Sequence, residues 1–326
     1  MLEHGGRLRE AAAHYAIPLA DWLDLSTGIN PNAWPVPALP ATVWHRLPEN
    51  GDGLEAAAQA YYGNPKLLPV AGSQAAIQWL PVLLPRAAVA CIAPLYAEHP
   101  QAWQHAGHKI RFLQNATLPR ALAAATPYVL LCNPNNPTAD HHPHEMVVDA
   151  ARQLKKRGGW LIVDEAFVDA TPELSVTSLA GSEEAPNLIV LRSLGKFFGL
   201  AGARVGFIFG VPEKLDPIRE MLGPWPVSHP SRAVARAALQ DMAWQAGARH
   251  LGLADDYVGW ALDKQNQDLL SPALRAKLEE LRVDILTGKI QVHDYLQDGQ
   301  CALKKPQQGA LCPPQEQRQP GGLCKS

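Results

Sequence analysis

The sequence predicts an α/β fold in which a mostly parallel sheet lies between two layers of helices. Apolar runs of strand length alternate along the chain with segments of helical periodicity. Several of these runs are apolar at every position, which is typical of strands buried on both faces. Polar residues follow three of the runs, at Asn136, at Asp164 and over residues 193–196. The carboxyl ends of parallel strands meet at one edge of a sheet, so a site is expected there.

The predicted elements follow in chain order. A helix is expected over residues 53–62, ended by Gly63 and Pro65. A strand, a tight glycine turn and a helix that opens at Ser73 are expected over residues 67–84. The remaining elements are a helix within 145–159 and strands within 87–94, 126–138, 160–167, 187–197 and 203–210.

The length of 326 residues exceeds what one ordinary core fills, so more than one domain is expected. We expect an N-terminal arm over residues 1–45 that contributes to the substrate site, and a large domain over 46–250. A partial or divergent C-terminal segment should follow over 251–298, with a charged helix and a short strand at 288–295. Residues 299–326 are rich in Gln, Pro and Gly and are expected to be a disordered tail.

Composition excludes several classes of function. The net charge is -2 with no basic stripe, so no nucleic-acid partner is expected. No apolar run is long enough for a membrane span, and the first residues lack a signal-peptide core, so we expect a cytoplasmic protein. The five cysteines form no CxxC pair and no Cys/His metal spacing, so neither a metal site nor disulfides are expected.

The strongest chemical signal is Lys196, which lies in a loop after a buried strand and is followed eight residues later by Arg204. A lysine amine can bond to a carbonyl cofactor. The Arg204 guanidinium and the Ser193 hydroxyl can hold a phosphate, since arginine offers a planar fork of donors. The small residues between them let the backbone approach closely. The alternative is a surface lysine and arginine beside a glycine turn.

Two further signals follow buried strands. Asp164 ends a fully apolar strand, where a carboxylate is costly unless it is paired. A carboxylate facing a pyridinium nitrogen keeps that nitrogen protonated. The alternatives are a helix N-cap and a buried ion pair. Asn136 lies in the loop NPNNPT and could donate to a pyridine oxygen, although an Asn beside Pro is also a common turn device.

Two weaker signals lie nearer the N-terminus. Ser73 and Gln74 stand at a predicted helix start, where free backbone N–H groups and the helix dipole attract phosphate. An ordinary N-cap is the alternative. Tyr96 follows a predicted strand and could stack on a cofactor ring, although a core or surface tyrosine is the usual explanation.

These residues occur in the order found in fold-type I pyridoxal-phosphate (PLP) enzymes. Residues 1–250 resemble the class I and II aminotransferase superfamily, in the branch of histidinol-phosphate aminotransferases and threonine-phosphate decarboxylases. The opening His4-Gly5-Gly6 and the segment LSTGINP over residues 25–31 are similar to the decarboxylases. The resemblance implies an aspartate-aminotransferase-like fold, a PLP cofactor, a small phosphorylated amino-acid substrate and a homodimer.

The resemblance also implies a role for each residue. Lys196 bonds the cofactor aldehyde and later moves protons, Asp164 pairs the pyridine nitrogen, Asn136 contacts O3′ and Tyr96 stacks on the ring. The side chains that hold the cofactor phosphate are Ser73, Gln74, Ser193 and Arg204. Those near the substrate are His4, Thr27 and Asn30, with His4 a candidate for the substrate phosphate.

The sequence departs from the family pattern at three places. Phe167 stands where many relatives carry a tyrosine that donates to O3′. Leu47 stands where relatives carry a tyrosine that reaches the neighbouring subunit's cofactor phosphate. The small-domain arginine that binds the substrate carboxylate is not found in a strand context, because Arg275 and Arg282 lie on a predicted charged helix and are expected to face solvent.

Three functions follow as hypotheses. The first is decarboxylation of L-threonine O-3-phosphate to (R)-1-aminopropan-2-yl phosphate and CO2 in cobalamin biosynthesis. The second is transamination of histidinol phosphate or a similar phosphorylated amine, which differs by requiring a 2-oxo acid acceptor. The third is a PLP-binding protein without turnover, which the unplaced carboxylate-binding arginine motivates.

Overall fold

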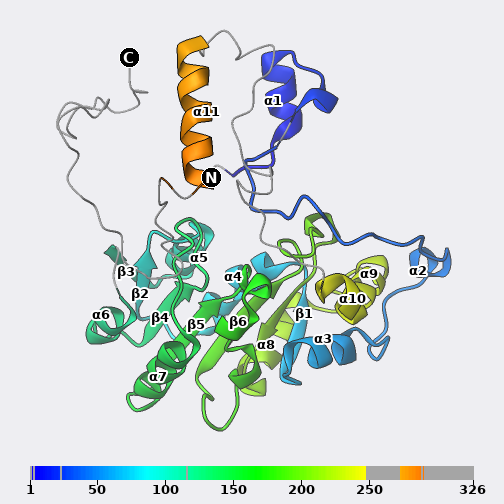
Figure 1. Cartoon of the computed structure of the whole chain (residues 1–326). Coiled ribbons are helices and arrows are strands. Elements are labelled where there is room, and N and C mark those ends of the chain that lie inside the picture. Colours follow the sequence, from blue (N-terminus) through cyan, green and yellow to red (C-terminus); the bar gives the residue numbers. More distant parts are fainter. Residues whose placement is uncertain are drawn as a thin grey trace. The chain divides into compact units, whose positions relative to one another are not determined.

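Seven strands form one sheet in the order β1-β7-β6-β5-β4-β2-β3 (Figure 1). The strands are β1 (Leu67–Val70), β2 (Ala88–Ala93), β3 (Lys109–Gln114), β4 (Tyr128–Cys132), β5 (Trp160–Asp164), β6 (Leu188–Ser193) and β7 (Gly206–Phe209). The pairs from β3 to β6 along this order are parallel, whereas β7 is antiparallel to both β1 and β6. The sheet is therefore mostly parallel, as predicted, and the carboxyl ends of β2, β4, β5 and β6 meet at one edge.

The structure is a computed structural model that describes residues 2, 4–22, 24–114, 117–246, 272–287 and 289. Contacts divide the chain into two units, residues 1–250 and 251–326. In the second unit, the expected charged helix is α11 (Pro272–Leu286). The expected strand at 288–295 lies outside the described residues except for residue 289. The expected tail over 299–326 lies outside them entirely.

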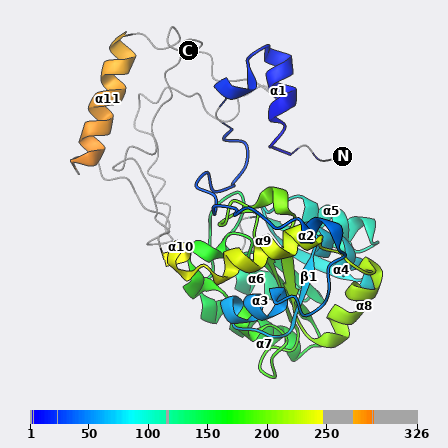
Figure 2. The ribbon, with the colours of Figure 1, turned by 90° about the vertical axis from the view of Figure 1, so that its right-hand side faces the viewer.

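Helices cover both faces of the sheet (Figures 1 and 2). The α-helices of the first unit are α1 (Leu8–Tyr15), α2 (Thr42–His45), α3 (Leu54–Tyr62), α4 (Ser73–Leu83), α5 (Glu98–His105), α6 (Leu118–Ala123), α7 (His144–Lys155), α8 (Pro212–Leu222), α9 (His229–Gln240) and α10 (Met242–Ala246). The 3-10 helices are η1 (Leu19–Asp21), η2 (Val168–Ala170), η3 (Pro172–Leu174), η4 (Thr177–Leu179) and η5 (Ala201–Ala203). Helices α3, α6, α7 and α9 pack on one face, and α4, α5 and α8 pack on the other.

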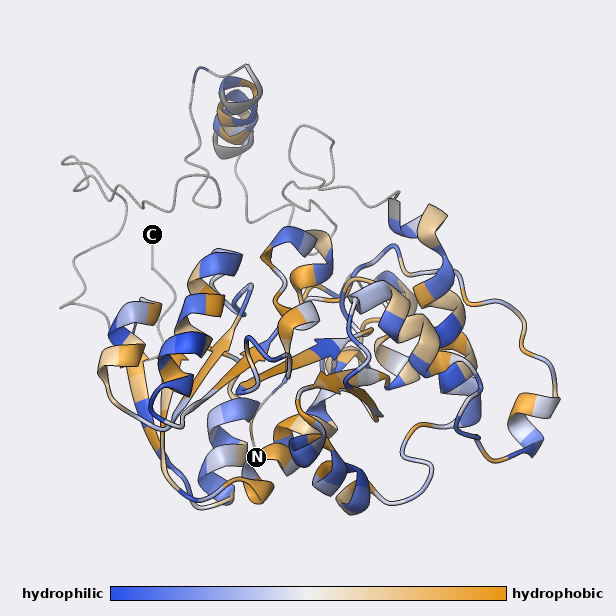
Figure 3. Cartoon of the chain, turned by 90° about the horizontal axis from the view of Figure 1, so that it is seen from below, coloured by the Kyte–Doolittle hydropathy of each residue, from blue (hydrophilic) through white to orange (hydrophobic). Residues whose placement is uncertain are grey.

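Alternate residues of each central strand enter separate cores on the two faces of the sheet. Leu161 and Val163 of β5 belong to the core beneath α3, α6, α7 and α9, whereas Ile162 belongs to the core beneath α4, α5 and α8. The two-residue period of a strand produces this alternation. Burying each such side chain contributes roughly 1.5–3 kcal/mol. Figure 3 shows the strands largely in the hydrophobic colour, while the helices carry both colours.

The helices and strands predicted within the described residues are present, and some elements were missed. Helix α3 ends at Tyr62 as predicted, because Gly63 adopts a left-handed φ of 70° and its N–H donates to the carbonyl of Gln59. Strand β3 is not evident in the sequence because it is an edge strand that exposes Lys109 and Arg111 and therefore lacks an apolar run. Charged edge positions of this kind also discourage pairing with a further strand. The domain boundaries at residues 45 and 298 stay predictions.

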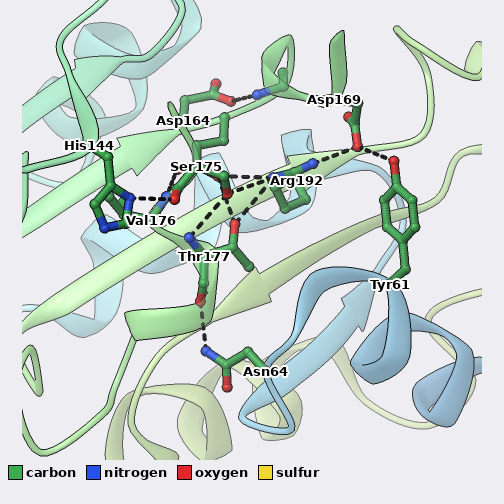
Figure 4. Close-up of polar contacts among 11 residues, drawn as sticks. Tyr61, Asn64, His144, Asp164, Asp169, Ser175, Val176, Thr177 and Arg192 are labelled. Atoms are coloured by element: carbon green, nitrogen blue, oxygen red, sulfur yellow. Dashed lines mark hydrogen bonds and ion pairs between the residues drawn. The ribbon is translucent and has the colours of Figure 1, made fainter. Parts of the chain in front are cut away.

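A buried ion network joins the ends of β5 and β6 (Figure 4). Arg192 of β6 directs Nη1 to Glu165 Oε2 at 3.0 Å and Nη2 to Asp169 Oδ1 at 2.5 Å, and its side chain is 4% exposed. The Tyr61 hydroxyl donates to Asp169 Oδ1 at 2.9 Å, and the Thr177 hydroxyl donates to Glu165 Oε2 at 2.7 Å. Both carboxylates thus have a cation and a hydroxyl donor, as buried charges require.

Replacing Arg192 with methionine should lower the free energy of unfolding by about 3–5 kcal/mol, because Glu165 and Asp169 would stay buried without a cation. Urea denaturation at pH 7 measures this change. The matched control is Arg152→Met, which removes an exposed pair with Glu184 and should cost no more than about 1 kcal/mol. Equal losses in the two variants would contradict a stabilising role for the buried network.

Candidate active site

One pocket opens at the carboxyl ends of the parallel strands, with a volume of about 680 Å³ that includes its open mouth. Eight residues singled out in the sequence line it together: Ser73, Gln74, Tyr96, Asn136, Asp164, Ser193, Lys196 and Arg204. They come from the start of α4, from the loops after β2 and β4, from the last residues of β5 and β6, and from the loop between β6 and β7. These residues lie together because β2, β4, β5 and β6 are parallel, so the last residues of the strands and the loops that follow them lie at the same edge of the sheet.

Two glycines shape one end of the pocket. Gly72 has a φ of 73°, and a Cβ there would lie 2.6 Å from Arg204 Nη2, so only glycine lets the guanidinium lie across the start of α4. A Cβ at Gly206 would lie 2.5 Å from the backbone nitrogen of Ser73. Within the described chain, Arg204 has no carboxylate partner and the N–H of Ser73 donates to no other group. This end of the pocket therefore offers uncompensated donors and a positive charge to an anion.

The buried carboxylate of Asp164 lies at another wall of the pocket. Its Oδ1 accepts from the backbone N–H of Ala166 at 3.0 Å, and its Oδ2 lies 2.7 Å from Nε2 of His99, whose side chain is 1% exposed. Because a carboxylate accepts, the His99 ring donates to it through Nε2. Asp164 thus ends its strand as an oriented acceptor that faces the pocket.

Cys132 lies beside this pair, so His99, Cys132 and Asp164 bring three metal-ligand atoms within 4.8 Å of one another. The His99 nitrogen is already bonded to Asp164. Burial, with the charge of Asp164, raises the pKa of the Cys132 thiol well above its ordinary value. The thiol is then neutral, whereas a metal takes the thiolate. The geometry therefore gives a bonded His–Asp pair beside a thiol, and the absence of a metal stays a prediction.

Lys196 presents its amine inside the pocket. Burial lowers the pKa of Lys196, the Asp164 charge opposes this shift and the Arg204 charge adds to it. The ammonium nitrogen lies 5.2 Å from the centroid of the Phe167 ring. Among described residues the amine forms no ion pair, although the charge of Asp164 acts on it. A lysine with a depressed pKa has a larger neutral, nucleophilic fraction near pH 8.

The remaining wall carries an amide and an aromatic ring. The half-buried Asn136 side chain has no hydrogen-bond partner among described residues, so its donors and acceptor are free for a ligand. Tyr96 is half-buried, its hydroxyl donates weakly to Gln74 Oε1 at 3.5 Å, and burial raises its pKa. The pocket thus combines a planar aromatic wall with polar groups that face different directions.

The three residues assigned to the substrate lie at different places. His4 Nε2 lies 2.6 Å from Glu98 Oε1, and Glu98 Oε2 accepts from Gln74 Nε2 at 2.7 Å, so His4 is connected to the pocket lining through Glu98. Thr27 lies beside Gly6, where an added Cβ would be 3.4 Å from its Cγ2. Asn30 donates through Nδ2 to the carbonyl of Phe197 at 2.8 Å. The substrate roles of these residues stay predictions.

Sequence reasoning missed His99 and Glu98. Both lie in the first turn of α5, and their importance comes from Asp164 and His4, which are distant in the sequence. A histidine after a strand–loop junction carries no distinctive local signal, so only the folded chain reveals the pair with Asp164. Cys132, beside the pair, is buried as well, at 7% exposed.

The departures from the family pattern lie as follows. Leu47 is exposed. Phe167 lines the pocket. Arg282 lies on α11 and contacts Glu279 of the same helix at 3.2 Å, whereas the side chain of Arg275 is outside the described residues.

No described helix is both long and apolar enough to cross a membrane.

The chain matches the family model for aminotransferase class I and II over residues 44–250. A threonine-phosphate decarboxylase from Pseudomonas aeruginosa is 54% identical over 75% of this chain and 73% of its own length. A threonine-phosphate decarboxylase from Sinorhizobium sp. is 46% identical over 73% of this chain and 71% of its own length. A histidinol-phosphate aminotransferase from Shewanella oneidensis is 41% identical, but over only 34% of this chain and 27% of its own length.

Solved structures share the fold. A histidinol-phosphate aminotransferase from Clostridium acetobutylicum superposes with a TM-score of 0.59 at 20% identity, over 68% of this chain and 70% of that one. A histidinol-phosphate aminotransferase from Sinorhizobium meliloti, solved in complex with pyridoxal-5'-phosphate, gives a TM-score of 0.56 at 26% identity, over 63% of this chain and 59% of that one. The predicted aspartate-aminotransferase-like fold is confirmed, since an aspartate aminotransferase from Thermus thermophilus superposes with a TM-score of 0.61 at 17% identity, over 76% of this chain and 72% of that one.

Acylation of Lys196 should show a pH midpoint below the ordinary lysine value of about 10.5. The protonated amine does not react, so the midpoint reports the pKa. Because the Arg204 charge lowers that pKa, Arg204→Gln should move the midpoint upward, while Arg219→Gln, an exposed residue paired with Asp216, should leave it in place. Mass spectrometry of acetylated peptides from cofactor-free protein gives both values. A midpoint that stays or falls in Arg204→Gln would contradict this electrostatic account.

Proposed function

Because this chain belongs to the aminotransferase class I and II family, we propose that it is a PLP-dependent enzyme that decarboxylates L-threonine O-3-phosphate to 1-aminopropan-2-yl phosphate and CO2. The observation that carries the proposal is the single pocket in which a lysine of lowered pKa, a buried carboxylate and an unpaired arginine meet. The decarboxylase relatives align with three quarters of the chain, whereas the Shewanella oneidensis aminotransferase aligns with about a third.

The pocket fits PLP through features of the chain itself. The phosphate would lie where Gly72 and Gly206 leave room beside Arg204, Ser73 and Ser193. Gln74 lies on the same wall and adds an amide. Each of these side chains donates to an anion, and the start of α4 adds its dipole.

The other residues suit the ring of the cofactor. Asp164 would accept from the pyridine nitrogen, and His99 holds the Asp164 carboxylate in orientation at 2.7 Å. Asn136 would donate to the phenolic oxygen, and Tyr96 would stack on the ring. When bound, PLP supplies an aldehyde for the substrate amine and an electron-withdrawing ring that stabilises negative charge at the substrate α-carbon.

Lys196 is the acid–base group of the proposed reaction. Its lowered pKa favours the neutral amine that bonds the cofactor and that can later carry a proton between Nζ and the substrate α-carbon. Decarboxylation rather than transamination requires the carboxylate bond to stand perpendicular to the ring, and groups that bind the substrate position it. His4, Thr27 and Asn30 are proposed for that side of the site, with His4 near the substrate phosphate.

The wild-type protein with added PLP should release CO2 from carboxyl-labelled L-threonine O-3-phosphate without a 2-oxo acid. Lys196→Ala should lose this release by at least roughly a thousandfold, because the amine that moves protons is gone. Trapping labelled CO2 measures the rate. The matched control is Lys214→Ala, which lies on α8 outside the pocket and should keep the wild-type rate.

Other outcomes would select the other functions. Product formation that depends on a 2-oxo acid, without CO2 release, would replace the decarboxylase by an aminotransferase. PLP absorbance without any turnover would leave a PLP-binding protein. A chain that binds no PLP would contradict the cofactor assignment itself.

We also propose that the protein is a cytoplasmic homodimer. Cys91 and Cys132 are buried free thiols, as a reducing compartment allows. Near the end of the N-terminal arm, Trp44 is 66% exposed and Leu47 is 59% exposed, and we propose that the partner subunit covers these two apolar side chains.

The double change Trp44→Glu and Leu47→Glu should shift the protein from dimer toward monomer, because charges resist burial in an apolar interface. Sedimentation velocity at micromolar concentration measures the distribution. Met221→Glu, which changes an exposed apolar residue of α8, is the control and should stay dimeric. A wild-type protein that sediments as a monomer would contradict the dimer.

A further inference from the structure

The N-terminal segment over residues 28–34 runs along the loop that carries Lys196. The backbone N–H of Asn30 donates to the carbonyl of Lys196 itself at 3.1 Å, and the Asn30 side chain donates through Nδ2 to the carbonyl of Phe197 at 2.8 Å. Four residues on, the N–H of Trp34 donates to the carbonyl of Phe198 at 2.9 Å. Three successive carbonyls of the lysine loop therefore accept from one distant segment.

The orientation of the Asn30 amide is fixed from its other side. Its Oδ1 accepts from the backbone N–H of Asn32 at 2.9 Å, so Nδ2 is the atom that faces Phe197. The segment is fastened again at Trp34, which is 6% exposed and whose indole N–H donates to Asp241 at 3.0 Å. Because the bond from Asn32 already orients the Asn30 amide, its bond to the Phe197 carbonyl costs little additional side-chain entropy.

Close packing adds to these hydrogen bonds. Gly199 has a φ of 67°, and a Cβ there would lie 2.5 Å from Ala33 Cβ and 2.9 Å from the carbonyl oxygen of Asn30. At the other end, a Cβ on Gly28 would lie 2.9 Å from the ring of Phe167, which in turn lies beneath the Lys196 amine. The segment thus contacts the lysine loop along its backbone and contacts the pocket wall through Phe167.

We propose that Asn30 is a positioning residue that holds the Lys196 loop, and with it the lysine amine, in the place that cofactor binding requires. Only the statement about cofactor binding rests on the proposed function. The carbonyl of Lys196 accepts from both Asn30 and Gly199, so the turn that begins at the lysine is fixed from inside and outside the loop. Without the Asn30 side chain, the Phe197 carbonyl loses its donor, while the backbone N–H groups of residues 30 and 34 keep their bonds to the carbonyls of Lys196 and Phe198.

The first experiment compares Asn30→Ala with Asn32→Ala. Asn32 is the matched control because it is exposed, lies in the same segment, and contributes only its backbone N–H, which alanine keeps. In cofactor-free protein, hydrogen exchange over residues 28–34 and 194–200 should accelerate at least about fivefold in Asn30→Ala, as expected for one lost hydrogen bond. Asn32→Ala should match the wild type.

Two further readouts separate positioning from simple support of the fold. The pH midpoint of Lys196 acylation should rise in Asn30→Ala, because a loosened loop exposes to water an amine whose pKa burial lowers, while Asp164 and Arg204 still face it. The dissociation constant for PLP should increase roughly five- to tenfold. The urea midpoint of global unfolding should change by no more than in Asn32→Ala.

Asn30→Asp tests the donor directly. It keeps the volume of Asn30 but turns a second oxygen toward the Phe197 carbonyl, so its effects should equal or exceed those of alanine. A second pair keeps the proposal testable if Asn30 variants fold poorly. Gly199→Ala should weaken the contact between loop and segment, whereas Gly202→Ala, where a Cβ meets nothing within 4 Å, should not.

Equal exchange rates in Asn30→Ala and Asn32→Ala, or a harmless Asn30→Asp, would overturn the positioning role. A wild-type chain that binds no PLP would instead overturn the proposed function. The exchange and acylation measurements would still decide the role of Asn30, because neither needs the cofactor.

Discussion

Arg192 carries its charge between two buried carboxylates, at 3.0 Å from Glu165 and 2.5 Å from Asp169, at the ends of two neighbouring strands. The ion pair affects the pocket because its members adjoin pocket residues in the sequence. Glu165 directly follows Asp164, and Arg192 directly precedes Ser193, so the ion pair fixes two pocket residues through one peptide bond each. Unpaired, either charge would be costly in this interior. This network therefore joins the ends of β5 and β6, which carry Asp164 and Ser193 in the pocket lining.

The pocket above that network is organised by which charges the chain compensates and which it leaves free. Asp164 has its oxygens bonded to His99 and to the Ala166 N–H, so its orientation is set before any ligand binds. Lys196 and Arg204, in contrast, have no carboxylate partner among described residues. A ligand with an anionic group and a basic ring nitrogen would pair with the two free cations and with the Asp164 carboxylate at once. Such preorganised groups need no rearrangement when charge develops in a reaction.

The N-terminal arm, which precedes the sheet in the sequence, is connected to the pocket at two places. It reaches the lysine loop through Asn30, and it reaches Gln74 at the start of α4 through His4 and Glu98. The same short arm therefore contacts the loop that carries the reactive amine and the wall proposed for phosphate.

The sequence by itself determined the α/β class and the strands that precede Asn136 or end at Asp164 and Ser193, because unbroken apolar runs and glycine-punctuated helices are local signals. It also singled out Lys196 and Arg204, whose spacing is local. Only the tertiary structure decided that His99 bonds Asp164, that Asn30 bonds the Lys196 loop, and that β3 forms a charged edge. These contacts join residues far apart in the chain, and no short-range pattern encodes a partner that folding alone brings near.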